Sequence, residues 1–229
     1  MCCRIFGCHE FFDDLRAHFR AIRTLSKGVT TGLIELSADP DPIALFSRWY
    51  DEAEESGLLS PESMSLATST LAGTPSVRMV LLKGVDQDGF RFFTNYESRK
   101  AREIEANPQA ALCFHWSVLE RQVRVEGGVL RLPKEESEAY FGTRSRGSQT
   151  GAWASDQSRK IPDRRTLELK VSNVEDRFNE EDIPLPPYWG GYILEPHRIE
   201  FWQGRADRLH DRLFYTKTDG DWVIMRLQP

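Results

Sequence analysis

The chain has 229 residues, of which 40% are hydrophobic and 28% are charged, a balance that excludes an intrinsically disordered or collagen-like protein. Its 30 lysines and arginines stand against 35 aspartates and glutamates, so the formal net charge is −5. That charge disfavours non-specific binding to nucleic acid or to an anionic membrane surface, and no apolar segment approaches the roughly 20 residues that span a bilayer.

The N-terminal part of the sequence predicts an arm followed by one domain. Residues 1–38 show no clean hydrophobic period, so we expect an N-terminal arm there and a domain over residues 39–229. The first firm element is a helix that begins at Asp41, an N-cap residue, with Pro42 at the first helical position. Apolar side chains then recur at helical spacing, and Gly57 ends the helix.

The middle of the chain alternates apolar and polar residues with period two, which predicts strands. A helix is expected to start near Asn95 or Ser98 and to end before Asn107-Pro108, and a second helix follows Pro133 through Tyr140. The expected strands cover residues 64–68, 77–85, 90–94, 110–117 and 121–132.

The last third of the chain predicts one more helix and further strands. Leu167, Val171, Val174 and Phe178 form a helical stripe, and residues 184–187 form a stiff proline-rich connector. Strands are expected over residues 192–194, 199–202, 213–216 and 222–227. Many short strands with few helices between them predict a mainly β fold with peripheral helices, an antiparallel meander closed into a barrel.

Several familiar sites are absent from the sequence. There is no G-x-G dinucleotide fingerprint, no Walker A loop and no G-x-S-x-G elbow. The four cysteines, at positions 2, 3, 8 and 113, form no C-x-x-C pair, which favours a reducing compartment such as the cytoplasm. Cys113 and His115 would share one face of a strand, but two such side chains are too few to predict a metal site.

Clustered cations in an acidic chain indicate anion binding. Residues 142–165 carry six lysines and arginines against two aspartates. Arg78 and Lys83 interrupt an apolar strand and, five residues apart, would point to opposite faces. Arg99 and Lys100 fall at a helix start, where a bound anion would offset their repulsion by the helix dipole. The alternative is a solvated charged surface, which we expect for Arg121 and Arg124.

A flat ring could be held near the C-terminus. Residues 208–212, with two arginines and a histidine, follow the aromatic run at residues 201–204. An aromatic plane beside guanidinium and imidazole groups suits a planar ligand with a polar edge. Together with the arginine pairs, which suit phosphate, this pattern predicts one or two phosphorylated aromatic small molecules.

The motifs at these positions make the sequence similar to the pyridoxine (pyridoxamine) 5′-phosphate oxidase family, from about Asp39 to Pro229. The motifs that carry the resemblance are Arg78-Met-Val-Leu-Leu-Lys83, Phe92-Phe-Thr-Asn95, Ser98-Arg-Lys100, Arg121-Gln-Val-Arg-Val-Glu-Gly127, Ser148-Gln-Thr-Gly-Ala-Trp153, Gln157-Ser158, Trp189-Gly-Gly191, Glu200-Phe-Trp-Gln-Gly204, Arg208-Leu-His-Asp-Arg212 and Arg226-Leu227.

The resemblance implies an FMN-binding split β-barrel that acts as a homodimer, with FMN between the subunits. It assigns flavin contacts to Arg78, Met79, Val80, Leu81, Phe93, Thr94, Arg99, Lys100, Gln122, Gln157, Ser158, Trp202 and Arg212. It assigns substrate contacts to Lys83, Tyr140, Arg144, Ser148, Arg208, Leu209 and His210, of which the first four would contact the substrate phosphate.

The implied reaction oxidises pyridoxine 5′-phosphate and pyridoxamine 5′-phosphate to pyridoxal 5′-phosphate, with dioxygen as acceptor and hydrogen peroxide as product. Arg208 and His210 would be the catalytic residues over the pyridine ring. Each assignment has a plainer alternative: a surface histidine paired with Asp211 for His210, a core side chain for Trp202, and a packing residue for Tyr140.

Two segments depart from the family pattern. Where family members often carry R-x-x-Y, this chain has Arg23-Thr-Leu-Ser26, and where they carry H-S-R-P it has Gly142-Thr-Arg-Ser145. These departures leave two other functions open. One is a non-catalytic flavin or pyridoxal-phosphate binding protein on the same barrel, and the other is a split-barrel flavin oxidoreductase with a different substrate.

Overall fold

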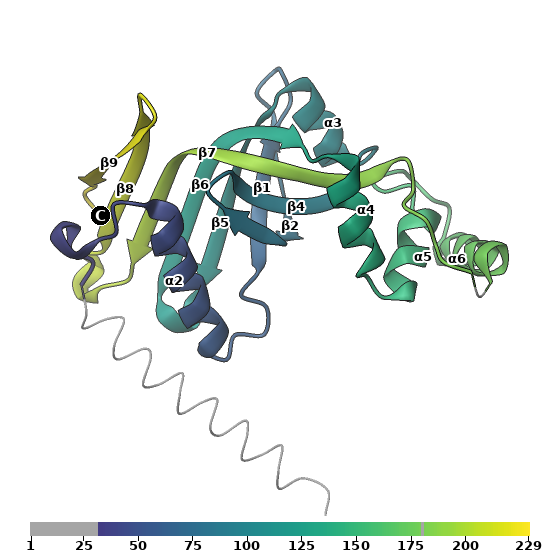
Figure 1. Ribbon diagram of the computed structural model, residues 1–229, viewed down its shortest axis with the longest axis horizontal. Coiled ribbons are helices and arrows are strands. Elements are labelled where there is room, and N and C mark those ends of the chain that lie inside the picture. The colour runs from purple at the N-terminus through teal and green to yellow at the C-terminus, as the bar shows by residue number, and fades with distance from the viewer. Residues whose placement is uncertain (1–31, 180) are drawn as a thin grey trace, which may run out of the picture. The chain divides into compact units, whose positions relative to one another are not determined.

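The computed structural model describes residues 32–179 and 181–229 (Figure 1). Its helices are η1 (Glu35–Ser37), α2 (Pro42–Glu55), α3 (Arg99–Ala106), η2 (Ser117–Leu119), α4 (Lys134–Gly142), α5 (Arg146–Ala154), α6 (Arg164–Phe178) and η3 (Ala206–Arg208). Its strands are β1 (Ser63–Ser69), β2 (Pro75–Leu81), β3 (Gly84–Asp86), β4 (Gly89–Asn95), β5 (Gln109–Trp116), β6 (Arg121–Arg131), β7 (Trp189–Gln203), β8 (Asp211–Thr218) and β9 (Asp221–Arg226).

The described residues divide into two compact units. Unit 1 comprises residues 32–65, 112–126 and 197–229, and unit 2 comprises residues 66–111 and 127–196 without residue 180. The predicted division into an arm at 1–38 and a domain at 39–229 stays a prediction, and residues 1–31 lie outside the described residues. The described end of that arm belongs to unit 1, where Glu35 accepts a 2.5 Å hydrogen bond from Arg226.

The central sheet curls into a barrel, as the sequence predicted. The strand order is β2-β1-β5-β6-β7-β4-β3, so β2 and β3 stand at its opposite ends. Only Leu82 and Lys83 separate these two strands along the chain, and β2 also contacts β4. The two-residue connection therefore brings the two end strands of the sheet next to each other.

The prediction of one strand over residues 77–85 was wrong, because the structure has two strands there, β2 and β3. The chain leaves β1 at Leu81 and joins β4 at Gly84, with the Lys83 amide donating to Arg91. Because the chain changes its neighbouring strand at Leu82 and Lys83, the two-residue alternation does not continue through the break. The expectation that Arg78 and Lys83 occupy opposite faces of one strand therefore does not hold.

The C-terminal strands extend the sheet in unit 1. The sequence predicted separate strands at 192–194 and 199–202, but β7 runs without interruption from Trp189 to Gln203. Its first part pairs with β4 and its last part pairs with β8, which pairs with β9. Pro196 lies between these two paired stretches, where its missing N–H leaves no ladder bond to β4 or β8 unmade.

The core of unit 1 forms around α2. The Asp41 side chain accepts from the Ile43 amide at 2.9 Å, which confirms the predicted N-cap, and Gly57 follows the helix with φ of +84°. Phe46 packs edge-on against Phe114 of β5, with ring centres 5.0 Å apart, so the apolar helix face is buried as its spacing predicted.

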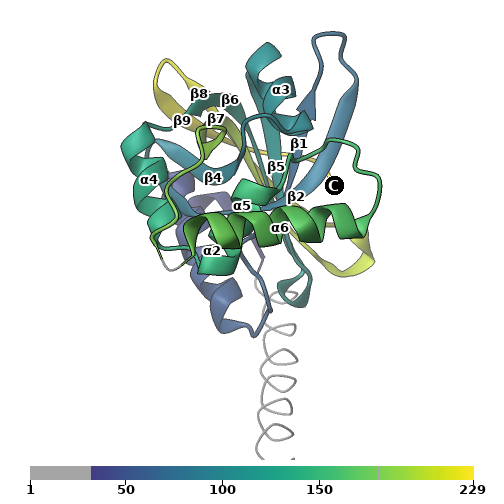
Figure 2. The same cartoon turned by 90° about the vertical axis from the view of Figure 1, so that its right-hand side faces the viewer.

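In unit 2 a second apolar cluster holds α4, α5 and α6 beside the start of β7 (Figure 2). Phe141 of α4, Phe178 of α6 and Trp189 of β7 are buried in this cluster. Helix α5 was not predicted, because Gly147 and Gly151 lower its intrinsic helix propensity. Its packing against α6 and the Gln149 bond to the Phe141 carbonyl stabilise it instead.

Within residues 32–179 and 181–229, no helix is long and apolar enough to cross a membrane. The same residues hold no cluster of three or more histidine, cysteine or acidic side chains that could bind a metal ion. Burial raises the pKa of the Cys113 thiol, which keeps this cysteine in its unreactive protonated form.

Candidate functional site

Unit 2 contains a cavity of about 240 Å³ between β2, β4 and the helices that follow β6. Its lining contains three cationic side chains, Lys83, Lys100 and Arg144, and no carboxylate. Most of its lining residues were candidate site residues in the sequence. They are Met79, Val80, Leu81, Lys83, Phe93, Thr94, Lys100, Tyr140, Arg144, Gln157 and Trp189.

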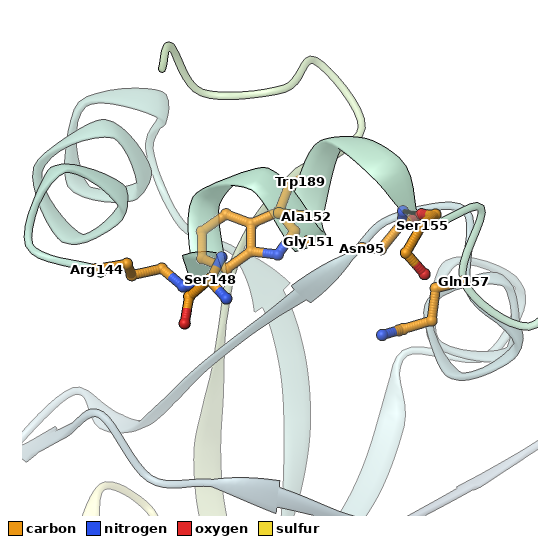
Figure 3. Close-up of a pocket in the computed structure, with 8 residues that line it drawn as sticks. All are labelled: Asn95, Arg144, Ser148, Gly151, Ala152, Ser155, Gln157 and Trp189. Atoms are coloured by element: carbon orange, nitrogen blue, oxygen red, sulfur yellow. Dashed lines mark hydrogen bonds between the residues drawn. The ribbon is translucent and has the colours of Figure 1, made fainter. Parts of the chain in front are cut away.

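A second cavity of about 300 Å³ has Arg144, Gln157 and Trp189 in common with the first (Figure 3). It adds Ser148, another predicted substrate residue, whose hydroxyl lies 2.9 Å from that of Ser145. Figure 3 shows the Arg144 side chain extending toward the Trp189 ring, with Ser148 beside it. The remaining lining residues are Asn95, Gly151, Ala152 and Ser155.

Three aromatic rings stack along the wall of the first cavity. The rings of Phe93 and Tyr140 have centres 4.0 Å apart at 23°, and those of Phe93 and Trp189 are 5.6 Å apart at 12°. Tyr140 therefore does pack, as its plainer interpretation expected, yet it also lines the cavity. A near-parallel stack next to cations is a surface on which a flat charged ring can lie.

The guanidinium of Arg144 has a buried nitrogen that no described residue accepts from. Its guanidinium lies 4.6 Å above the Trp189 ring, and its Nη1 is buried without a hydrogen-bond partner among the described residues. Burial lowers the pKa of this arginine, which nevertheless stays protonated at neutral pH. Because a buried unpaired cation is costly, a ligand phosphate is the natural partner for it.

Lys100 is the second cation that faces the cavity. It projects from the first turn of α3, whose N-cap Ser98 accepts from the Ala101 amide, and its ammonium donates to Gln157 at 2.7 Å and to Thr94 at 3.0 Å. Ser158 adds to this helix start, since its hydroxyl accepts from the backbone amide of Arg99 at 3.2 Å. The helix start predicted near Ser98 is confirmed.

The pKa of Lys100 is lower than that of an ordinary lysine, which makes its charge sensitive to pH. Burial, followed by the charge of Arg78, lowers the pKa of Lys100 to about 8. Because this folded-state value lies below that of the unfolded chain, the apoprotein gains stability as pH rises from 8 toward 10. We expect FMN affinity to fall by up to about tenfold per pH unit above pH 8, while affinity for riboflavin, which has no phosphate, stays level.

Fluorescence titration of both flavins between pH 7 and pH 10 measures this difference. The variant Lys100→Met is the matched control, because it removes the titrating group and should abolish the pH step. Equal pH dependence for FMN and riboflavin in the unmodified protein would contradict the assignment of Lys100 to the cofactor phosphate.

Two other predicted flavin residues, Arg78 and Arg99, converge on Glu103 outside these cavities. Arg78 donates to the Leu66 carbonyl at 3.0 Å and to the Thr68 hydroxyl at 2.6 Å, and its Nη2 lies 3.4 Å from Glu103. Arg99 donates through Nε to the same carboxylate at 2.9 Å. The sequence did not single out Glu103, because an acid in a charged helix usually faces solvent.

Unit 1 holds the remaining candidates. The rings of Trp202 and His210 have centres 4.6 Å apart, and His210 Nδ1 accepts from the Arg205 amide at 3.2 Å. In its neutral form, His210 therefore carries its proton on Nε2. The alternative of a His210–Asp211 pair was wrong, since the Asp211 carboxylate instead accepts from Arg226 at 2.6 Å. Arg208 and Leu209 are exposed, and Gln122 is half-buried.

Arg212, predicted as a flavin contact, is bound by protein groups within unit 1. Its Nε and Nη2 donate to Glu200 at 2.8 and 3.0 Å, and its Nη1 donates to the Gln228 carbonyl at 2.7 Å. Arg124 also pairs with Glu200, and Arg121 pairs with Glu52 at 2.6 Å. Arg121 and Arg124 thus form ion pairs, as expected, although the partner of Arg124 is a buried carboxylate rather than a surface one.

Removal of the Glu200 charge is expected to destabilise the protein. Glu200 is 4% exposed and is the shared counter-ion of two arginines. Because Glu200→Gln leaves partly buried cations unpaired, we expect a loss of about 2–4 kcal/mol and a Tm lower by roughly 5–15 °C. The control Glu126→Gln removes an exposed pair with Arg198 and should cost less than about 1 kcal/mol. Equal effects of the two substitutions on Tm would contradict this prediction.

Sequence reasoning missed several residues that line the cavities. Trp189 was noted in the Trp189-Gly-Gly191 motif without a role, although it borders both cavities. The only signal was a tryptophan before two glycines. Gly190 and Gly191 are required there, because a Cβ atom would lie 2.2 Å from the Tyr96 hydroxyl or 2.5 Å from Leu132. Asn95 stood in the Phe92-Phe-Thr-Asn95 motif without a role, and Ser155 gave no signal that distinguishes it from an ordinary loop residue.

Comparison with known proteins identifies relatives along nearly the whole chain. A family profile described as pyridoxamine 5′-phosphate oxidase matches residues 50–178, and one described as the pyridoxine 5′-phosphate oxidase C-terminal dimerisation region matches residues 189–229. A pyridoxine/pyridoxamine 5′-phosphate oxidase of Rubrobacter xylanophilus is 58% identical over 198 residues, covering 86% of this chain and 91% of that protein. One of Psychromonas ingrahamii is 52% identical over 220 residues, covering 96% and 100%.

Solved structures show the same fold. PhzG from Burkholderia lata, in complex with tetrahydrophenazine-1-carboxylic acid, has a TM-score of 0.83 at 32% identity and covers 88% of this chain and 100% of its own. A pyridoxamine 5′-phosphate oxidase-related, FMN-binding protein from Nostoc punctiforme has a TM-score of 0.67 at 19% identity and covers 84% and 99%. These likenesses confirm the predicted split β-barrel.

Proposed function

Because the chain belongs to the pyridoxine/pyridoxamine 5′-phosphate oxidase family, we propose that it oxidises pyridoxine 5′-phosphate and pyridoxamine 5′-phosphate to pyridoxal 5′-phosphate. The cofactor is FMN, and dioxygen is the final electron acceptor. The alcohol substrate gives the aldehyde and hydrogen peroxide, while the amine substrate also takes up water and releases ammonia. The reaction would belong to vitamin B6 salvage, and the cysteine usage supports a cytoplasmic location.

The observation that carries this proposal is the buried Nη1 of Arg144, which has no hydrogen-bond partner among the described residues and lies at a cavity whose described lining has three cations and no carboxylate. A phosphate ester supplies the missing negative charge and the acceptor oxygens. The stacked rings of Phe93, Tyr140 and Trp189 beside it suit a flat aromatic ligand. Substrate and cofactor each combine a phosphate with such a ring, so the residues present fit both.

FMN, when bound, supplies the ring that accepts a hydride, and the protein supplies position and charge. Lys83, Arg144 and Ser148, with Tyr140, would bind the substrate phosphate and so fix the distance of the reacting carbon from the flavin. Lys100 with the amides at the start of α3 would bind the cofactor phosphate. Gln157 accepts from Lys100 and lines both cavities, so it would hold this lysine toward the cofactor.

Arg208 and His210 are proposed as the catalytic residues. Arg208 would stabilise negative charge that develops near the reacting carbon, while His210 would orient the ring or accept a proton. The contact of His210 with Trp202 and its bond from the Arg205 amide hold the imidazole in one orientation. A side chain held in this way can position a ring without rearrangement during the reaction.

A homodimer is the proposed active form, with FMN between the subunits. The match to a C-terminal dimerisation region supports the assembly. Strand β2 adds a physical reason, since Val77, Met79 and Leu81 on one of its faces are 68%, 60% and 42% exposed. Three alternating apolar side chains on one exposed strand form a face that a partner would cover.

The phenazine ligand of PhzG raises the alternative of a substrate without phosphate. The carboxylate of such a substrate carries one negative charge, whereas a phosphate monoester carries about −1.5 to −2. A cavity lined by three cations therefore favours a phosphorylated substrate. A non-catalytic binding protein is the other alternative. The experiment that tests the proposed activity also distinguishes it from these two alternatives.

The test measures oxygen consumption by the FMN-loaded protein with pyridoxamine 5′-phosphate, pyridoxine 5′-phosphate and unphosphorylated pyridoxamine. We expect equimolar pyridoxal 5′-phosphate and hydrogen peroxide from the first two and little turnover of the third. No turnover by protein that retains FMN would favour a binding role, and turnover independent of the phosphate would favour a different substrate.

A further inference from the structure

Glu103 occupies an unusual position for a charged residue of helix α3. Its side chain is 6% exposed, whereas Glu105, the other acid of this helix, is exposed. Thr68 and Ser76, on neighbouring strands β1 and β2, each donate a hydroxyl to its Oε2 at 2.5 Å. Burial would raise the pKa of Glu103, but these bonds and the one from Arg99 lower it to about 2. The side chain is therefore a buried carboxylate.

The groups around Glu103 are cations of the proposed cofactor site. Arg99 donates through Nε at 2.9 Å, while Arg78 approaches to 3.4 Å and also donates to Thr68 and Ser76. Lys100 projects from the next position of the helix, and the charge of Arg78 lowers its pKa. The three cations therefore repel one another, and Glu103 is the carboxylate that contacts two of them.

The charges in this cluster are complementary to a phosphate ester. Arg78, Arg99 and Lys100 with Glu103 leave a residual charge of two positive units on the cluster. A phosphate monoester carries about −1.5 to −2 at neutral pH. The cluster is thus only partly neutralised by the protein, and the missing charge matches one such ester.

We propose that Glu103 is the internal counter-ion of the cofactor phosphate site: it keeps Arg78, Arg99 and Lys100 together before the phosphate arrives and reduces the attraction of the site for that phosphate. This inference rests on the proposed binding of FMN. It assigns to Glu103 a function in the apoprotein, where these cations contact no other carboxylate among the residues that the structure describes. Glu103 also lowers the affinity of the site for the FMN phosphate, because its negative charge stays near the bound phosphate.

The variant Glu103→Gln isolates the charge. Glutamine keeps an oxygen that can accept from Arg99 Nε, so the side-chain shape remains while the negative charge is lost. We expect the Tm of the apoprotein to fall by roughly 5–10 °C and that of the FMN-bound protein by less than about half as much. By linkage, FMN should bind about tenfold more tightly relative to riboflavin, which has the same ring and no phosphate.

The matched control is Glu105→Gln on the same helix, where the carboxylate pairs with Arg131 at 2.7 Å. This substitution should leave the ratio of FMN to riboflavin affinity unchanged. A purely structural Glu103 would lower the Tm of both forms equally and would leave that ratio unchanged, and a falling ratio would show that Glu103 only orients the arginines. Either result would overturn the proposal.

A second variant keeps the proposal testable if Glu103→Gln does not accumulate as folded protein. The double variant Arg99→Gln with Glu103→Gln returns the cluster to its original net charge. It should fold and should recover at least half of the lost apoprotein Tm, and failure to recover it would contradict the counter-ion function. These measurements on the apoprotein need no flavin, so they separate failure of this inference from failure of the proposed FMN binding.

Discussion

Replacement of Arg144 by alanine is expected to raise the KM for pyridoxamine 5′-phosphate by about 100-fold, because charge-assisted hydrogen bonds from a partly buried guanidinium to phosphate are worth about 3 kcal/mol. Arg144 fits this function since its Nη1 is buried without a described partner and its guanidinium is held over Trp189. The value of kcat should change much less, because the phosphate is remote from the carbon that is oxidised. Steady-state kinetics with varied substrate measure both constants.

Two comparisons separate phosphate binding from general damage at this site. Turnover of unphosphorylated pyridoxamine should be equally poor before and after Arg144→Ala. The control Arg146→Ala removes a nearby arginine that instead donates to the Glu181 carbonyl at 2.8 Å, and it should leave the KM unchanged. An equal loss for phosphorylated and unphosphorylated substrates would contradict the assignment of Arg144.

Replacement of Arg208 by alanine is expected to slow flavin reduction by about 100- to 1,000-fold, as when a group that stabilises transition-state charge is removed. FMN affinity should change by less than about threefold, because Arg208 is proposed to act on the substrate. The φ of Arg208 is +60°, in the left-handed region. Alanine also has a Cβ atom, so the backbone cost of about 1–2 kcal/mol is the same in both proteins.

Stopped-flow absorbance under anaerobic conditions measures the reduction rate of Arg208→Ala, and fluorescence titration measures its FMN affinity. The control Arg198→Ala removes an exposed partner of Glu126 in the same unit and should change neither quantity. Equal losses in reduction rate and in FMN affinity would contradict a catalytic function for Arg208.

Local signals predicted the elements whose ends are determined by their own residues. Helix α2 begins at Asp41-Pro42 because a capping carboxylate and a preset φ act within one turn, and α3 begins after Ser98 for the same kind of reason. The stripe ending at Phe178 likewise predicted α6. In each case the relevant hydrogen bonds and apolar contacts repeat at a period that the sequence displays.

The sequence could not predict features that depend on distant partners. The break at Leu82 and Lys83 follows from a change of neighbouring strand, and α5 forms through contacts with α4 and α6 despite two glycines. The side-chain partners of Arg78 could not be predicted from the sequence either. Its apolar strand suggested an anion ligand, whereas Thr68, Ser76 and Glu103, the last of them 25 residues away, accept most of its hydrogen bonds.

The candidate site was predicted only in part, because some of its features also depend on residues that are distant in the sequence. Motif resemblance named ten of the eleven residues that line the 240 Å³ cavity, and the structure brings these ten together in unit 2. No role was predicted for Trp189 or Glu103, because a core tryptophan and an acid in a helix are common in any sequence. Their significance lies in what surrounds them, a guanidinium over the ring of Trp189 and two arginines at the carboxylate of Glu103.

The visible spectrum of the FMN-loaded protein under anaerobic conditions tests the proposed oxidation most directly. Addition of pyridoxamine 5′-phosphate should bleach the yellow flavin, and admission of air should restore the colour as pyridoxal 5′-phosphate appears. A flavin that stays yellow with pyridoxamine 5′-phosphate and with pyridoxine 5′-phosphate would contradict the proposed oxidase activity.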